Sequence, residues 1–129
     1  MAISLNQLVR AARPKPPIMT VYGVHGIGKT TFAAQAPSPV FVQTEDGLGT
    51  LACPHFPLAA TFEDVIGALA ALYTEPHDFR TCVIDSVDWL EALIWAKACR
   101  DNGWASIEDA GYGKGYVAAL NLWRQYIDG

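Results

Sequence analysis

The sequence lacks the features that mark membrane, secreted and disulfide-stapled proteins. No run of 18 apolar residues occurs, so we expect no transmembrane helix. Polar and basic residues interrupt the first 17 positions, which argues against a secretory signal peptide of the usual form. The three cysteines, Cys53, Cys82 and Cys99, form no Cys-x-x-Cys pair. An odd number of cysteines suits reduced thiols, so we expect a cytoplasmic protein.

Acidic residues are absent from the first 40 positions, where Arg10, Arg13, Lys15 and Lys29 give a charge of +4. The remainder carries five bases and thirteen acids, and the net charge of the chain is −4. This balance argues against a uniformly basic nucleic-acid-binding protein. The basic leading arm could contact a phosphate backbone or an acidic neighbour, or it could be a solvated tail.

The length of 129 residues, with 51% apolar and 17% charged residues, indicates one globular domain. Apolar runs and turn signals predict strands at residues 18–22, 40–43 and 81–84, and helices at 29–36, 61–75, 87–98 and 115–127. We expect a capping box at residues 61–64 and a loop at 100–113. Because strands alternate with helices, the pattern predicts βαβ units and a parallel sheet.

A glycine-rich turn between the first strand and the first helix carries the strongest functional signal. Residues 23–30 match the pattern GxxxxGK[ST] at every fixed position. Glycines let successive backbone N–H groups point at phosphate oxygens, and the lysine brings an ammonium group to the β- and γ-phosphates. The predicted nucleotide-binding residues are Gly23, Val24, His25, Gly26, Ile27, Gly28, Lys29, Thr30 and Thr31. Of these, Thr30 is also a predicted Mg²⁺ ligand.

Two carboxylates follow predicted strands and therefore belong at the same edge of a parallel sheet. Asp85 ends the third strand, where it would hold Mg²⁺ through its water shell; the alternative is an ordinary turn aspartate. Many ATPases place a glutamate directly after this aspartate, but Ser86 stands there. Glu45, just past the second strand, is the candidate catalytic base for ATP hydrolysis, unless it is only a solvated loop acid. No Asn-Lys-x-Asp motif occurs, which argues against a GTPase.

These segments resemble a known family. Residues 83–87 resemble the Walker B strand of RecA, residues 41–46 resemble the RecA segment that carries the catalytic glutamate, and residues 28–31 match the RecA P-loop ending. The chain as a whole looks like the shortened RecA-like AAA ATPases encoded by bacteriophages and prophages, some of which act in single-strand annealing and recombination. The resemblance implies a three-layer α/β P-loop NTPase with a mostly parallel sheet, in which Lys29, Glu45 and Asp85 are catalytic.

The resemblance also implies partners and a domain plan. We expect residues 1–17 to form a short helix and a Pro-rich basic arm, and residues 18–129 to form an ATPase core that is incomplete at its C-terminus. ATP, Mg²⁺ and single-stranded DNA are the expected ligands, and a homo-oligomer is the expected state of the complete protein. Leu5, Leu8 and Val9 would anchor the arm on a neighbouring subunit, although they could instead fold back onto their own domain.

One departure and two alternatives stay open. The 100–113 loop lies near the position of the first DNA-contacting loop of RecA, but Arg100 is its only basic residue, against Asp101, Glu108 and Asp109, which argues against DNA contact there. In and just after this loop, Trp104, Tyr112 and Tyr116 could stack on nucleic-acid bases or pack against the body. The first alternative function is a small-molecule or nucleotide kinase. The second is a non-catalytic module that binds ATP to control its assembly.

Overall fold

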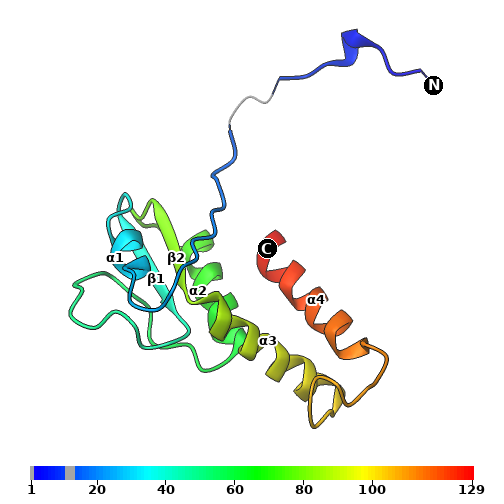
Figure 1. Cartoon of the computed structure of the whole chain (residues 1–129). Coiled ribbons are helices and arrows are strands. Elements are labelled where there is room, and N and C mark those ends of the chain that lie inside the picture. The colour runs from blue at the N-terminus through cyan, green and yellow to red at the C-terminus, as the bar shows by residue number, and fades with distance from the viewer. Residues whose placement is uncertain (1, 11–13) are drawn as a thin grey trace.

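The computed structural model describes residues 2–10 and 14–129. Along the chain lie η1 (Leu5–Gln7), α1 (Lys29–Ala34), β1 (Pro39–Gln43), α2 (Phe62–Thr74), β2 (Thr81–Asp85), α3 (Val87–Asn102) and α4 (Lys114–Asp128) (Figure 1). In this part of the chain, no helix combines the length and apolar character needed to cross a membrane. The α/β character predicted from the sequence is confirmed.

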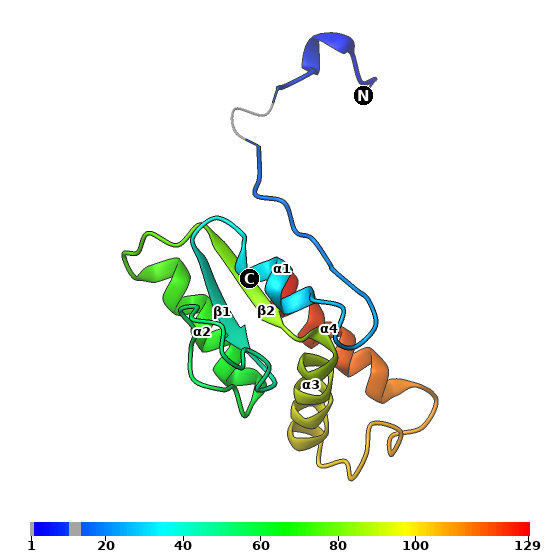
Figure 2. The ribbon, with the colours of Figure 1, turned by 60° about the vertical axis from the view of Figure 1, so that its left-hand side comes forward.

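The sheet consists of β1 and β2 in the described residues, and the two strands are parallel. Their register pairs Pro39 with Thr81 at one end and Gln43 with Asp85 at the other. The second edge of β1 is covered by residues 54–59, which form three backbone hydrogen bonds with it, each of 2.9 Å. Figures 1 and 2 show α1 and α2 on opposite sides of the strand pair. Because the two strands are parallel, their carboxyl ends lie at the same edge of the sheet.

The prediction of a strand at residues 18–22 is wrong. This segment forms no strand, and its side chains are largely exposed, with Ile18 at 84% and Tyr22 at 92%. An apolar run becomes a strand only where a neighbouring strand satisfies its N–H and C=O groups. Within the described residues, the pairing of β1 with β2 does not extend to this segment. It leads instead as extended chain into the glycine-rich turn.

One apolar face of the sheet builds the core. Val42 packs in a buried cluster with residues of α2, α3 and α4, and Phe62, Val65, Leu90 and Ile94 are at most 1% exposed. Burying a side chain of this size stabilises a fold by about 1.5–3 kcal/mol. The predicted stripe on α3 is confirmed at Leu90, Ile94 and Ala98, whereas Val87 is 42% exposed.

Helix boundaries follow local capping chemistry. The capping box predicted at residues 61–64 is confirmed, because the Asp64 N–H donates to Thr61 Oγ1 and the Thr61 N–H donates to the Asp64 carboxylate. The prediction that a loop begins at residue 100 is wrong, because α3 continues to Asn102. The helix is capped by Gly103, whose φ is 69°. A left-handed residue stops a helix, and glycine adopts that conformation without a steric penalty.

The leading arm extends away from the body (Figure 1). A single 3₁₀ turn, η1, stands where a short helix was predicted, and Leu5, Leu8 and Val9 are each more than three-quarters exposed. These three side chains do not fold back onto their own domain. Arg13, part of the predicted basic arm, lies outside the described residues, as do Met1, Ala11 and Ala12.

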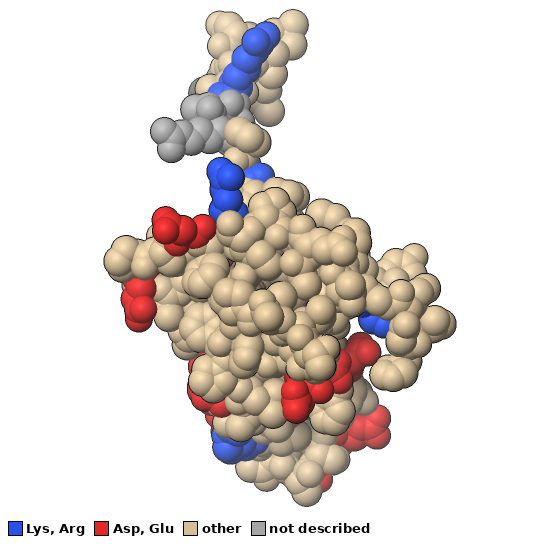
Figure 3. Space-filling model, turned by 90° about the vertical axis from the view of Figure 1, so that its left-hand side faces the viewer, with Lys and Arg blue, Asp and Glu red and all other residues tan. Residues whose placement is uncertain are grey.

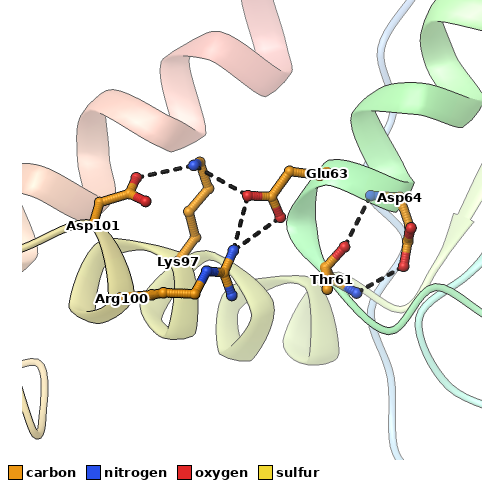
Figure 4. Close-up of polar contacts among 6 residues, drawn as sticks. All are labelled: Thr61, Glu63, Asp64, Lys97, Arg100 and Asp101. Atoms are coloured by element: carbon orange, nitrogen blue, oxygen red, sulfur yellow. Dashed lines mark hydrogen bonds and ion pairs between the residues drawn. The ribbon is translucent and has the colours of Figure 1, made fainter.

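A group of charged side chains joins the start of α2 to the end of α3 (Figure 4). Glu63 accepts hydrogen bonds of 2.8 and 3.0 Å from Arg100 and lies 3.2 Å from Lys97 Nζ, which also contacts Asp101 at 2.9 Å. A hydrogen bond from its own backbone N–H is the largest influence on the Glu63 carboxyl. Together with Lys97 and Arg100, this bond lowers its pKa from 4.5 to about 2.

This lowered pKa predicts an acid-dependent contribution to stability. The folded-state pKa of Glu63 lies below its unfolded value, so its contribution is complete above pH 4.5 and is lost as the pH falls toward about 2. Because Glu63 is half exposed, we expect no more than about 1 kcal/mol. Urea unfolding at a series of pH values should show Glu63→Gln less stable than the parent at pH 6 and the difference closing near pH 2.

The matched control is Glu91→Gln, which changes an exposed carboxylate on α3 that has no ion-pair partner among the described residues. Its stability should follow that of the parent across the same range. A constant difference between Glu63→Gln and the parent at every pH would contradict the proposed ion-pair contribution.

Candidate functional site

The glycine-rich turn at residues 23–28 lies on the surface and leads directly into α1. Gly26 and Gly28 have φ values of 79° and 105°, in the left-handed region that favours glycine. The Phe32 N–H donates to the Gly28 carbonyl at 2.9 Å, which closes the first turn of α1. Glycine is therefore required at these two positions by the backbone, independently of any ligand.

Lys29 curls back over its own loop. Its Nζ donates hydrogen bonds to the carbonyls of Gly23, at 2.7 Å, and Val24, at 3.1 Å. An ammonium group has three N–H donors and no acceptor, and the two carbonyls occupy two of them. The third N–H can donate to an anion bound in the loop. The cation predicted to bind phosphate therefore lies within the turn and not in the solvent beyond it.

Thr30 and Asp85 connect the loop to the sheet. The Thr30 hydroxyl donates to Asp85 Oδ2 at 2.7 Å, across 55 positions of sequence. A hydroxyl that donates its proton keeps its lone pairs, so Thr30 Oγ1 can bind a cation while Asp85 accepts that proton. Both oxygens are hard donors of the type that Mg²⁺ prefers. No group of three or more His, Cys, Asp and Glu side chains suited to a metal occurs in the described residues.

Thr44 clamps the two strand ends together. Its hydroxyl accepts from the Ser86 N–H at 2.8 Å and donates to the Ser86 carbonyl at 2.6 Å, while its own N–H donates to the Asp85 carbonyl at 2.9 Å. Thr44 is 7% exposed, so these hydrogen bonds are shielded from competing water. The residue that follows Thr44 is therefore held at a defined place beside Asp85.

That residue is Glu45, the predicted catalytic base. A Cβ placed on Gly47 would stand 4.0 Å from Glu45 Cγ and 3.9 Å from Asp85 Oδ2. The two carboxylate side chains thus flank Gly47, and the missing side chain leaves the space beside them open. Glu45 is half-buried, which suits a group that must reach a bound ligand.

The structure therefore brings together Lys29, Thr30, Asp85 and Glu45 at one edge of the sheet. His25 and Thr31, also predicted to bind nucleotide, are exposed. The roles of all these residues stay predictions. The same edge is bordered by Gln43, Thr44 and Gly47, which the sequence pattern did not indicate as site residues. The polar run Gln43–Asp46, which begins inside the strand and continues past its end, could have indicated this edge.

The segment at residues 100–113, near the position of the first DNA-contacting loop of RecA, carries little positive charge. Arg100 belongs to α3 and is paired with Glu63, and residues 103–113 contain no lysine or arginine. Tyr112 is fully exposed, but the Tyr116 hydroxyl donates to Glu108 at 2.7 Å and its ring packs edge-on against Trp95. Packing against the body is thus confirmed for Tyr116. Figure 3 shows basic side chains along the leading arm and acidic side chains scattered over the body.

Comparison with known families finds a match. A family model described as an AAA domain matches residues 15–129, which include the glycine-rich turn and both carboxylates. No curated protein and no solved structure matches the chain.

Proposed function

Because this chain belongs to the AAA domain family, we propose that it binds ATP with Mg²⁺ and hydrolyses the nucleotide. The observation that carries the proposal is the 2.7 Å hydrogen bond between Thr30 and Asp85. It joins the end of a complete GxxxxGK[ST] loop to a carboxylate at the carboxyl end of a parallel strand, where ligands bind in open α/β sheets.

Each side chain then has a defined task. The N–H groups of residues 23–29 and the Lys29 ammonium bind the phosphates. Thr30 would bind Mg²⁺ through its hydroxyl oxygen, while Asp85 accepts the hydrogen bond from that hydroxyl and would hold the ion through water. When bound, Mg²⁺ would neutralise the negative charge that develops on the phosphates as the bond to the leaving oxygen breaks. Glu45 accepts a proton from the attacking water on the side of the site next to Gly47.

The loop assignment predicts that Lys29→Ala abolishes binding of Mg²⁺–ATP. The substitution removes the cation that contacts the loop carbonyls and would reach the phosphates. Titration with a fluorescent ATP analogue measures the loss directly. Lys114→Ala, which removes an exposed lysine at the start of α4, is the matched control and should bind as the parent does. Equal affinity of Lys29→Ala and parent would show that the loop does not bind nucleotide.

If Glu45 is the catalytic base, its substitution should slow ATP hydrolysis without weakening ATP binding. Glu45→Gln keeps the size of the side chain and removes its proton-accepting charge, so turnover should fall by roughly 10²-fold or more. Affinity for ATP should remain close to that of the parent. Asp85→Asn should instead raise the Mg²⁺ concentration needed for half-maximal activity.

Asp46→Asn, on the exposed neighbour of Glu45, is the control for charge alone and should leave both quantities unchanged. If Glu45→Gln hydrolyses ATP at the parental rate, the base lies elsewhere, and Asp88 in the first turn of α3 becomes the next candidate.

Coupling of hydrolysis to single-stranded DNA is a finer part of the proposal. The charge distribution supports the leading arm as the contact, since Arg10 and Lys15 are exposed there and residues 103–113 lack a base. Basic side chains release counterions when they bind a phosphate backbone, which makes such contacts sensitive to salt. Assembly of subunits through Leu5, Leu8 and Val9 stays a prediction, supported by their exposure.

The DNA contact predicts that single-stranded DNA raises the ATPase rate at low salt and that the increase fades as salt rises. The double variant Arg10→Gln, Lys15→Gln should lose most of the increase and keep the basal rate. Arg80→Gln, a charge change on the exposed surface of the body, should behave as the parent. An increase that persists undiminished in the double variant would remove the arm from the proposal.

A further inference from the structure

Gln43, the last residue of β1, has a buried amide nitrogen that makes no hydrogen bond to the part of the chain that the structure describes. The residue is 5% exposed, and its Nε2 is enclosed without any hydrogen bond in the described residues. A side-chain amide carries two donors, and buried donors in folded proteins are nearly always satisfied. An exception at this position therefore needs an explanation.

The direction of the Gln43 side chain follows from the pleat of the sheet. Val42 points into the apolar cluster formed with α2, α3 and α4, so Gln43 points to the opposite face. Its register partner is Asp85, and residues paired in this way lie on the same face of a sheet. Asp85 accepts the hydrogen bond from Thr30 of α1, and Figure 2 shows α1 on one side of the strand pair. The Gln43 amide is thus on the side of the sheet where the glycine-rich loop meets the strands.

Hydrogen bonds hold the backbone of Gln43 in place. The Gln43 carbonyl accepts a hydrogen bond from the Ala59 N–H at 2.9 Å, and the next residue, Thr44, is clamped to β2. A glutamine side chain has rotatable torsions, so its amide can turn from this fixed strand end toward an oxygen at the edge of the sheet. Simple packing does not require an amide, because methionine or leucine would fill similar space without burying a polar group.

We propose that Gln43 is a positioning residue of the nucleotide site, whose amide N–H donates a hydrogen bond to an oxygen brought by Mg²⁺–ATP. This inference rests on the proposed function. The acceptor is an oxygen of the phosphate chain or of a water bound to Mg²⁺, and both share the same chemistry. A neutral donor suits this place because Glu45 and Asp85 already provide the negative charges that hold the ion and accept protons. The amide restrains the ligand without changing that charge balance.

The test compares Gln43→Met with the parent in two measurements. Equilibrium titration with a fluorescent ATP analogue, with Mg²⁺ and with EDTA, should show an affinity about 10-fold weaker in the variant, the effect of one lost hydrogen bond. Thermal unfolding of the nucleotide-free protein should show an unchanged or higher midpoint, since the variant removes an unsatisfied donor. A merely structural glutamine would lower the midpoint and leave the affinity intact.

The two conditions distinguish the acceptors. A weaker affinity in both conditions indicates a phosphate oxygen, and a weaker affinity only with Mg²⁺ indicates a metal-bound water. Gln43→Glu, which keeps the shape and removes the donor, serves as the second variant and should also lose affinity. Gln125→Met, at an exposed glutamine of α4, is the matched control and should bind as the parent does.

Unchanged Mg²⁺–ATP affinity in both Gln43 variants would overturn the inference. The proposed function would still stand if Lys29→Ala lost binding in the same assay. Failure of the parent itself to bind Mg²⁺–ATP would overturn the proposed function and this inference together.

Discussion

The parallel pairing of β1 with β2 is the constraint on which the candidate site depends. Residues after the two strands lie about 40 positions apart in the sequence, and the register sets Gln43 beside Asp85. The buried Thr44 hydroxyl adds two hydrogen bonds to Ser86 at the point where both strands end. Without this pairing, Glu45 and Asp85 would occupy unrelated loops, and the glycine-rich turn would have no carboxylate to meet.

At the strand ends, the two faces of the sheet carry different kinds of side chain. Val42 and Ile84 pack toward α2, α3 and α4, where apolar burial favours one register because a slip by one residue would turn them outward. The same alternation directs Gln43 and Asp85 to the face that α1 covers. The core therefore fixes the position of polar groups that contribute little to it. A site on strand ends gains precision in this way, since the strands are anchored on their other face.

Local signals predicted much of the fold. Strands at 40–43 and 81–84, the capping box at Thr61 and the stripe on α3 were correct, because β-rich runs, caps and helical periodicity act over a few residues. The strand at 18–22 was wrong, although its apolar pattern is as strong. Strand formation there depends on a partner strand, and the pairing observed in the sheet stops at β2. The start of the 100–113 loop was also wrong, because α3 continues until Gly103 allows a left-handed turn.

The sequence by itself determined the loop at residues 23–30, since its glycines, lysine and threonine stand at contiguous positions and their spacing alone carries the chemistry. It also indicated Asp85 and Glu45 as separate candidates, one after each strand. Only the tertiary structure decided that Thr30 meets Asp85, that Thr44 ties the strand ends together and that the Gln43 amide is buried unpaired on the same face. Contacts across 40 or more residues depend on strand register and on the direction of each side chain, and both arise from packing of the sheet against its helices.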